Sequence, residues 1–238
     1  MDLTDDRPLA LVTGAARGIG AEVARQLAED GYAVVVTARD LASASAHAET
    51  LVSEGHAAVG AVLDVADPAS VAALAREVGR RPLRVLVNNA AAFADWTETA
   101  TSADLDNARA VLDTNLLGPW RVTVALLPAL RAGAPARVVN VGSGSGSHGD
   151  PQFGLSTSPV STSYAVSKAA LHALTVKLSV ELAEEGIVVN AVDPGLTATA
   201  PGMEAMGARP VTEGAASVLA ALRAPAGTFT RDGETLPW

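Results

Sequence analysis

A tyrosine and a lysine four residues apart form a pair that could exchange a proton with a bound molecule. They are Tyr164 and Lys168 in the stretch S-Y-A-V-S-K, and the chain has only two tyrosines and two lysines. A phenol ionises near pH ~10, so proton exchange near neutral pH requires an adjacent positive charge. Residues four apart on a helix share one face, with about 6 Å between their Cβ atoms. We therefore expect Lys168 to lie beside Tyr164 and favour its ionised form; a coincidental surface pair is the alternative.

A second chemical feature is the glycine-rich stretch T-G-A-A-R-G-I-G, residues 13–20, which follows a short apolar run. Gly14, Gly18 and Gly20 permit a tight turn and let a pyrophosphate approach the backbone. The helix expected to start near Gly18 offers free N–H groups and the positive end of its dipole. A strand before the loop and a helix after it are the context in which such a motif binds a dinucleotide. A glycine-rich turn without a ligand is the alternative.

Short apolar runs alternate with longer amphipathic stretches along the chain, and these elements must position the pair and the loop. We expect strands at 9–12, 33–36, 57–63, 85–87, 138–141, 187–189 and 228–230, and helices at 19–29, 41–53, from 67–68, 102–130, 163–185 and 211–223. The strand runs are continuous rather than alternating, which indicates strands buried on both faces. The pattern predicts an α/β fold: one domain over residues 1–238, with a parallel sheet of about seven strands and helices on both faces.

The composition narrows the classes of partner. The net charge is −9, which disfavours nucleic acid, because phosphate binding needs a basic surface. There is no cysteine, and the four histidines are scattered without ligand spacing, so we expect neither disulfides nor a metal site. The start, M-D-L-T-D-D-R-P, lacks the features of a signal peptide, and no apolar run approaches the roughly 20 residues of a membrane span. We expect a cytoplasmic protein without a membrane partner.

Together, the motifs resemble those of the short-chain dehydrogenase/reductase family. The glycine loop matches T-G-x-x-x-G-I-G, and the pair matches Y-x-x-x-K. Further matches are Asn88-Asn89-Ala90, Asn115, Ser143 and Pro194-Gly195, so the resemblance covers the chain from about residue 9 to residue 238. It implies a Rossmann-type doubly wound fold and an oxidoreductase that acts on CH–OH or C=O groups.

The resemblance also implies catalytic roles for four residues. Tyr164 would be the general acid/base, and Lys168 would also hold the nicotinamide ribose. Ser143 would bind the carbonyl oxygen, with Ser145 as a competing candidate, since V-G-S-G-S-G departs from the family's N-V-S-S-x-x-G pattern. Asn115 would help to hold a water that connects the lysine to solvent; its alternative role is that of an amide in helix packing.

The cofactor is expected to be NADP(H). Arg39 stands where NAD-using relatives place an acidic residue, and Arg17 lies in the glycine loop, so two guanidiniums could clamp a 2′-phosphate. Asp40 keeps NAD(H) open as the less favoured cofactor. The full set of positions assigned to the cofactor is Thr13, Gly14, Arg17, Gly18, Ile19, Gly20, Arg39, Asp64, Val65, Asn88, Ala90, Tyr164, Lys168, Pro194, Gly195, Thr197 and Thr199.

The expected activity is the NADPH-dependent reduction of an aldehyde, ketone or quinone to an alcohol, since the strand-two residues T-A-R-D and the chain's ending look most like carbonyl reductases. Residues 142–163, which form a long loop, and residues 196–211 are expected to build the substrate site. The alternatives are a biosynthetic ketoreductase or alcohol dehydrogenase for one specialised metabolite, and a non-catalytic NADP(H)-binding sensor. The chain is expected to act as a monomer or a homo-oligomer.

Overall fold

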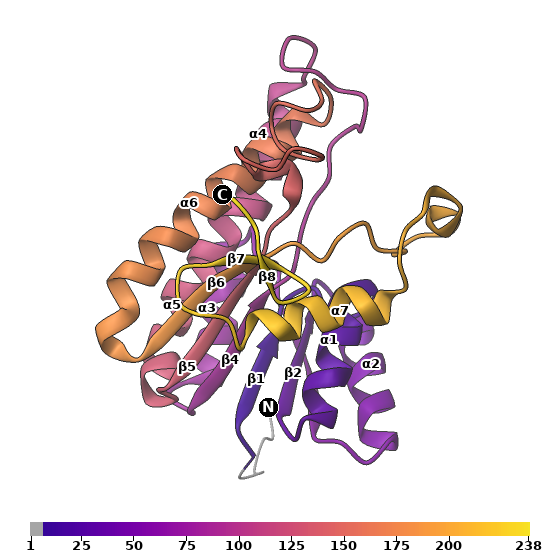
Figure 1. Cartoon of the computed structure of the whole chain (residues 1–238). Coiled ribbons are helices and arrows are strands. Elements are labelled where there is room, and N and C mark those ends of the chain that lie inside the picture. The colour runs from indigo at the N-terminus through magenta and orange to yellow at the C-terminus, as the bar shows by residue number, and fades with distance from the viewer. Residues whose placement is uncertain (1–6) are drawn as a thin grey trace.

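The computed structural model describes residues 7–238, which form one α/β unit on a single sheet (Figure 1). The strands are β1 (Leu9–Val12), β2 (Ala33–Ala38), β3 (Ala58–Val62), β4 (Leu83–Asn88), β5 (Ala136–Val141), β6 (Ile187–Val192), β7 (Phe229–Arg231) and β8 (Glu234–Thr235). Their spatial order is β3-β2-β1-β4-β5-β6-β7-β8, and β8 alone among these runs antiparallel to its neighbour. The expected parallel sheet is confirmed. The count of about seven strands is corrected to eight, because a turn at 232–233 adds the short β8.

Helices cover both faces of the sheet. α3 (Pro68–Val78), α5 (Gly118–Ala132) and α6 (Thr162–Leu182) pack on one face, and α1 (Gly18–Glu29), α2 (Leu41–Ser53) and α7 (Val211–Ala221) pack on the other (Figure 1). α4 (Leu105–Leu112) contacts α6, and the short turns are η1 (Asp113–Leu117), η2 (Gly144–Gly146), η3 (Ala183–Glu185) and η4 (Met203–Met206). The doubly wound arrangement expected from the sequence is therefore confirmed.

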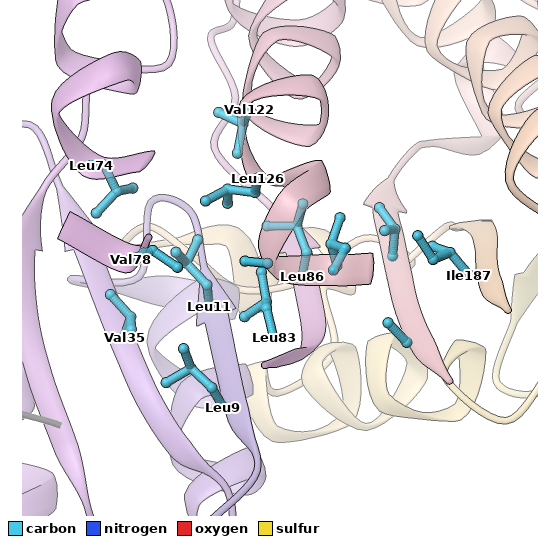
Figure 2. Packing of buried hydrophobic residues seen from close by; sticks show 14 of the residues in the cluster. Leu9, Leu11, Val35, Leu74, Val78, Leu83, Leu86, Val122, Leu126 and Ile187 are labelled. Carbon is cyan, nitrogen blue, oxygen red and sulfur yellow. The ribbon is translucent and has the colours of Figure 1, made fainter. Parts of the chain in front are cut away.

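The continuous apolar runs are buried along their whole length because successive residues of a strand point to opposite faces. In β1, Leu9 and Leu11 enter the core under α3 and α5, whereas Ala10 and Val12 enter the core under α1 and α7. Figure 2 shows the first core, in which Leu86 of β4 lies among the strand and helix side chains. Both faces of the central strands are thus buried, as the sequence indicated.

Two aspartates fix the starts of helices next to the expected nucleotide edge. Asp67 caps α3 by accepting a hydrogen bond from the Ala69 N–H at 2.9 Å, and Pro68 occupies the first helical turn. Asp40 caps α2 in the same way, accepting from the Ser43 N–H at 2.8 Å. The expected helix start at Asp67-Pro68 is confirmed, since a side-chain acceptor satisfies an N–H that the helix itself leaves free.

The long helical stretch expected at 102–130 runs without a gap from Leu105 to Ala132. One turn in its middle, η1, is π-helical rather than α-helical. Pro119 has no N–H, so the carbonyl of Asn115 lacks the donor that an α-helix would give it. The Gly118 N–H bonds instead to the Asp113 carbonyl, five residues back. The π-turn therefore contains Asn115, the helix residue that matches the family motif.

Two further predictions concern membrane spans and the acidic start of the chain. Within residues 7–238, no helix is long and apolar enough to cross a membrane. The acidic start, residues 1–6, lies outside the described residues.

We predict that Leu86→Ala destabilises the fold by about 2–5 kcal/mol, because this fully buried side chain would leave a cavity between β4 and α5. Urea unfolding followed by circular dichroism measures the change. Val180→Ala on the outside of α6, where the side chain is 74% exposed, should change the stability by less than about 0.5 kcal/mol. Equal losses in the two variants would contradict the assignment of Leu86 to the core.

Candidate active site

The expected site residues gather at the carboxyl edge of the sheet. The glycine loop follows β1, Asn88 ends β4, Ser143 follows β5, and Asp193 follows β6. Tyr164 lies in the first turn of α6, which packs over β6. Ligands of open parallel sheets bind in the crevice at this edge, so the topology alone brings these distant segments into one site.

Lys168 is buried next to Tyr164. Its Nζ donates a hydrogen bond to the Val141 carbonyl at 2.7 Å and lies 5.5 Å from the centroid of the Tyr164 ring. The side chain is 2% exposed. Burial lowers the pKa of Lys168 to about 8, although the nearby Asp193 carboxylate acts in the opposite direction. The expected pairing of lysine and tyrosine on one face of a helix is present.

The phenol of Tyr164 is more strongly held in its protonated form than the sequence led us to expect. Burial raises the pKa of Tyr164 above its ordinary value, the hydrogen bond with Ser143 lowers it, and the Asp193 carboxylate raises it again. Desolvation thus outweighs the neighbouring ammonium that we expected to favour the phenolate. A protonated phenol is suited to donating a proton.

Ser143 is the serine that contacts the tyrosine. Its hydroxyl forms a hydrogen bond with Tyr164, lies 2.7 Å from the Ser145 hydroxyl, and accepts from the Ser145 N–H at 3.3 Å. Ser145 is therefore a hydrogen-bond partner of Ser143, and Ser143 is the serine that interacts with the phenol. This geometry favours Ser143 over Ser145 as the residue that would face a substrate oxygen.

Asn115, at the π-turn, joins the loop after β4 to α6. Its Oδ1 accepts from the Ala92 N–H at 2.7 Å, and its Nδ2 donates to the Ala92 carbonyl at 2.9 Å and the Ser167 hydroxyl at 3.0 Å. The side chain of Asn115 is thus used in packing, and its backbone carbonyl lacks the α-helical donor that Pro119 cannot supply.

The glycine loop is closed against the end of β4. The Thr13 hydroxyl accepts from the N–H groups of Asn89 and Ala90, each at 2.9 Å. The Asn89 amide donates back to the Thr13 carbonyl at 2.9 Å and the Gly14 carbonyl at 3.1 Å. A Cβ at Gly20 would lie 2.3 Å from that amide nitrogen, so the closure requires glycine there. Gly14 and Gly18 have positive φ angles of 62° and 59°, a conformation that other residues rarely adopt, so the turn before α1 requires glycine at both positions.

The two arginines expected at the ribose end are exposed. Arg17 precedes α1, and Arg39 follows β2. Neither guanidinium forms a hydrogen bond or an ion pair with any of residues 7–238. By contrast, the Asp40 carboxylate is used by the cap of α2, and the hydrogen bond from the Ser43 N–H lowers the pKa of Asp40 below its usual range. An anion at this end would therefore meet two available cations.

Other predicted cofactor residues are structural through their side chains. Asn88 is buried and donates to Asn140 Oδ1 at 2.9 Å and to the Thr123 hydroxyl at 3.2 Å. Asp64 accepts from the Ala66 N–H at 2.9 Å and closes a turn after β3. The structure thus does not bring the side chain of Asn88 to the crevice. Val65 is also buried and packs against α5, and Ile19 packs partly against the core under α1.

The segment after β6 reaches back to the glycine loop. A Cβ at Gly18 would meet the Thr199 methyl at 3.4 Å, so this part of residues 196–211 lies over the start of α1. The Thr197 hydroxyl donates to the carbonyls of Pro194 at 3.1 Å and Gly195 at 3.0 Å, which orders the turn but uses its side chain. Of these two threonines, Thr199 is exposed and lies next to the glycine loop, whereas Thr197 is buried.

Sequence reasoning missed a charged centre beneath the site. The Asp193 carboxylate accepts from the Gly144 N–H at 2.8 Å, the Gly195 N–H at 2.7 Å and the Arg231 guanidinium at 2.5 Å. Arg231 also lies 3.7 Å from the Asp150 carboxylate of the long loop. The sequence did show an acidic residue, Asp193, directly before Pro194-Gly195. Nothing in the sequence indicated that it would pair with Arg231, 38 positions away.

His172, one turn after Lys168 on α6, is the other missed residue. Its ring packs against Phe229 at 4.3 Å and Trp238 at 5.5 Å between centroids, and burial, together with the charge of Lys168, lowers the pKa of His172 to about 4. The repeated four-residue spacing of Tyr164, Lys168 and His172 could have revealed this row. Among residues 7–238, no cluster of three or more acidic or histidine side chains could hold a metal ion.

Comparison with known proteins identifies the class to which this fold and site belong. Residues 8–208 match the model of the short chain dehydrogenase family, and the chain therefore belongs to that family of oxidoreductases. It is 36% identical to the oxidoreductase UcpA of Escherichia coli over 198 residues, which cover 80% of this chain and 69% of that protein. It is also 36% identical to the 3-oxoacyl-(acyl-carrier-protein) reductase FabG of Pseudomonas aeruginosa over 194 residues, covering 80% of this chain and 74% of FabG.

Among solved structures, the chain resembles the NADPH-bound carbonyl reductase from chicken fatty liver. The TM-score is 0.85 and the sequence identity is 29%, and the match covers 98% of this chain and 99% of the other. The likeness therefore includes the C-terminal strands as well as the nucleotide-binding half.

We predict that the protein loses stability as the pH falls from about 6.5 to about 4, because the unfolded chain binds a proton at residue 172 that the folded chain refuses until about pH 4. The free energy of unfolding should fall by up to about 3 kcal/mol from this group over that window. Urea unfolding at several pH values measures it. In His172→Leu this part of the slope should disappear, whereas exposed His148→Gln should keep it; identical slopes in wild type and His172→Leu would refute the assignment.

Proposed function

We propose that the chain is an NADPH-dependent reductase that converts the carbonyl group of an aldehyde, ketone or quinone into an alcohol. The observation that carries this proposal is the convergence of Ser143, Tyr164 and Lys168 at the sheet edge that also holds the glycine loop. A proton donor next to a nucleotide cradle is what hydride transfer to a carbonyl requires.

The residues present fit the proposed cofactor. The positive φ angles at Gly14 and Gly18 leave room for a pyrophosphate at the start of α1, where N–H groups are free. The exposed Arg17 and Arg39 suit a 2′-phosphate. Asp40, the acidic residue that keeps NAD(H) open as a cofactor, uses its Oδ1 atom to cap α2. The NADPH-bound structural neighbour adds support for NADP(H) over NAD(H).

Each catalytic residue then has a defined task. Bound NADPH supplies the hydride that reduces the carbonyl carbon. The Ser143 hydroxyl donates a hydrogen bond to the carbonyl oxygen and holds it beside Tyr164, which transfers its phenolic proton to that oxygen. Lys168 orients the nicotinamide ribose and stabilises the phenolate left behind. The backbone carbonyl of Asn115 holds the water through which the proton is replaced.

A narrower biosynthetic role is the second candidate. The similarity to FabG favours it, since that relative is named for the reduction of a 3-oxoacyl group. In either case we propose that residues 142–163 and 196–211 form the substrate site. A sensor without turnover is disfavoured, because the serine, tyrosine, lysine and asparagine of the family motif are all present.

We predict that Tyr164→Phe lowers kcat by roughly 10²–10⁴-fold, because the general acid is lost while the ring and its packing remain. NADPH oxidation at 340 nm with a panel of aldehydes, ketones and quinones measures turnover, and the fluorescence of bound NADPH shows that the cofactor still binds. Tyr32→Phe is the control. Tyr32 precedes β2 at the amino edge of the sheet, away from the candidate site, so this variant should behave as wild type. Near-normal turnover in Tyr164→Phe would disprove the catalytic assignment.

We predict that Arg39→Asp shifts the ratio of kcat/KM for NADPH to that for NADH by roughly 10–100-fold toward NADH, because a charge-assisted contact to the 2′-phosphate is replaced by repulsion. Arg80→Asp is the matched control, since Arg80 is exposed and precedes β4 at the amino edge of the sheet. If both variants keep the wild-type ratio, Arg39 has no role in cofactor choice.

A further inference from the structure

Aromatic side chains are scarce in this chain but concentrated around the candidate site. The sequence contains three phenylalanines, three tryptophans and two tyrosines among 238 residues. Two ring groups contain five of these eight: Phe93, Trp96 and Tyr164 form one, and Phe229 and Trp238 stack beside His172 in the other. Phe229 is fully buried and belongs to the core, whereas Phe93 and Trp96 are exposed, so the first group is the one whose placement indicates a role at the site.

The first group lies directly on the proposed proton donor. The Phe93 ring stacks on Tyr164 with centroids 4.9 Å apart and planes at 20°, and Trp96 lies 5.9 Å from Tyr164 and 5.2 Å from Phe93. Phe93 is 55% exposed and Trp96 is 59% exposed. Two large rings therefore present apolar surface to solvent beside the reacting group, an arrangement that marks a ligand-binding surface more often than a core.

This exposed pair is held in place by hydrogen bonds on both sides. The Trp96 carbonyl accepts from the Ser161 hydroxyl at 3.1 Å, and the buried Glu98 carboxylate accepts from the Ser163 N–H at 2.6 Å. On the other side, both backbone groups of Ala92 bond to Asn115. The backbone that carries Phe93 and Trp96 is thus tied to the start of α6 and to η1, so the rings are positioned before a ligand arrives.

The charges around these rings disfavour an anionic ligand. The two basic groups next to Tyr164 and Ser143 are occupied: Lys168 bonds to Val141, and Arg231 pairs with Asp193. The group closest in sequence to Trp96 is the exposed carboxylate of Asp95, whose hydrogen bonds from Thr97 lower its pKa and keep it ionised. A carboxylate, a coenzyme A ester or an acidic carrier protein would be repelled here rather than bound.

We propose that Phe93 and Trp96 form a stacking platform that selects uncharged carbonyl compounds whose C=O group is attached to a planar aromatic ring system. The inference rests on the proposed function. The flat ring of the substrate would lie against Trp96 and displace part of the Phe93 contact with Tyr164, bringing the carbonyl oxygen to the phenol and to Ser143. Stacking of two rings beyond simple burial is expected to favour such substrates by roughly tenfold.

The test compares two ketones of similar size, acetophenone and cyclohexyl methyl ketone, in wild type, Trp96→Leu and Phe93→Leu. Leucine keeps an apolar side chain at an exposed position, so the fold should survive, which thermal unfolding checks. We expect the ratio of kcat/KM for acetophenone to that for the cyclohexyl ketone to fall by roughly tenfold in each variant, mainly through KM. Trp120→Leu, which removes a tryptophan 47% exposed on α5, should leave the ratio unchanged.

Binding without turnover separates this inference from the proposed function. Quenching of tryptophan fluorescence by 2-naphthol, which cannot be reduced, should weaken roughly tenfold in Phe93→Leu but not in Trp120→Leu. If both ketones are reduced at ratios unaffected by Trp96→Leu and Phe93→Leu, the platform is refuted although the reductase is real. If no ketone is reduced but 2-naphthol binding depends on Phe93, the platform stands and the proposed activity fails. Preference for an acyl-coenzyme A ester over acetophenone would also overturn the inference.

Discussion

The carboxylate of Asp193 is the interaction on which the candidate site depends. It receives hydrogen bonds from the backbone of Gly144 and Gly195 and an ion pair from Arg231. One buried charge therefore joins the loop of the serine, the turn after β6 and the last strands of the sheet. Such a charge is costly to desolvate and tolerable only when fully partnered, so losing Arg231 would disturb all three segments together. Its field also reaches the phenol and the ammonium on α6 and raises the pKa of both.

Much of the fold could be predicted because its strands are buried on both faces. A continuous apolar run such as residues 34–36 is typical of a central strand in a parallel sheet, and Asp67-Pro68 specifies a helix start through one side-chain acceptor and one missing N–H. β8 could not be found in this way, since its two exposed residues carry no apolar pattern and pair only through the turn before them. The π-turn was equally hidden, although Pro119 accounts for it once the helix is known.

The sequence predicted which residues converge but not which polar atoms are already engaged. Spacing put Tyr164 and Lys168 on one helix face, and motif order put Ser143 near them. It could not show that the Asn88 amide is already hydrogen-bonded to the buried Asn140. Nor could it show that burial, rather than the lysine, governs the pKa of Tyr164. Hydrogen-bond partners and desolvation depend on contacts between distant segments, and a single sequence does not encode these in a readable local pattern.

The burial of Lys168 has a practical consequence for labelling the protein. The chain has no cysteine and one other lysine, Lys177, which is exposed on the same helix. Nine residues of α-helix carry the chain through two and a half turns, so Lys177 lies about 13 Å further along and on the opposite side. An amine-reactive dye or support would find a single exposed lysine side chain, on the side of the helix opposite Lys168. Attachment through Lys177 would leave the nucleotide edge of the protein free.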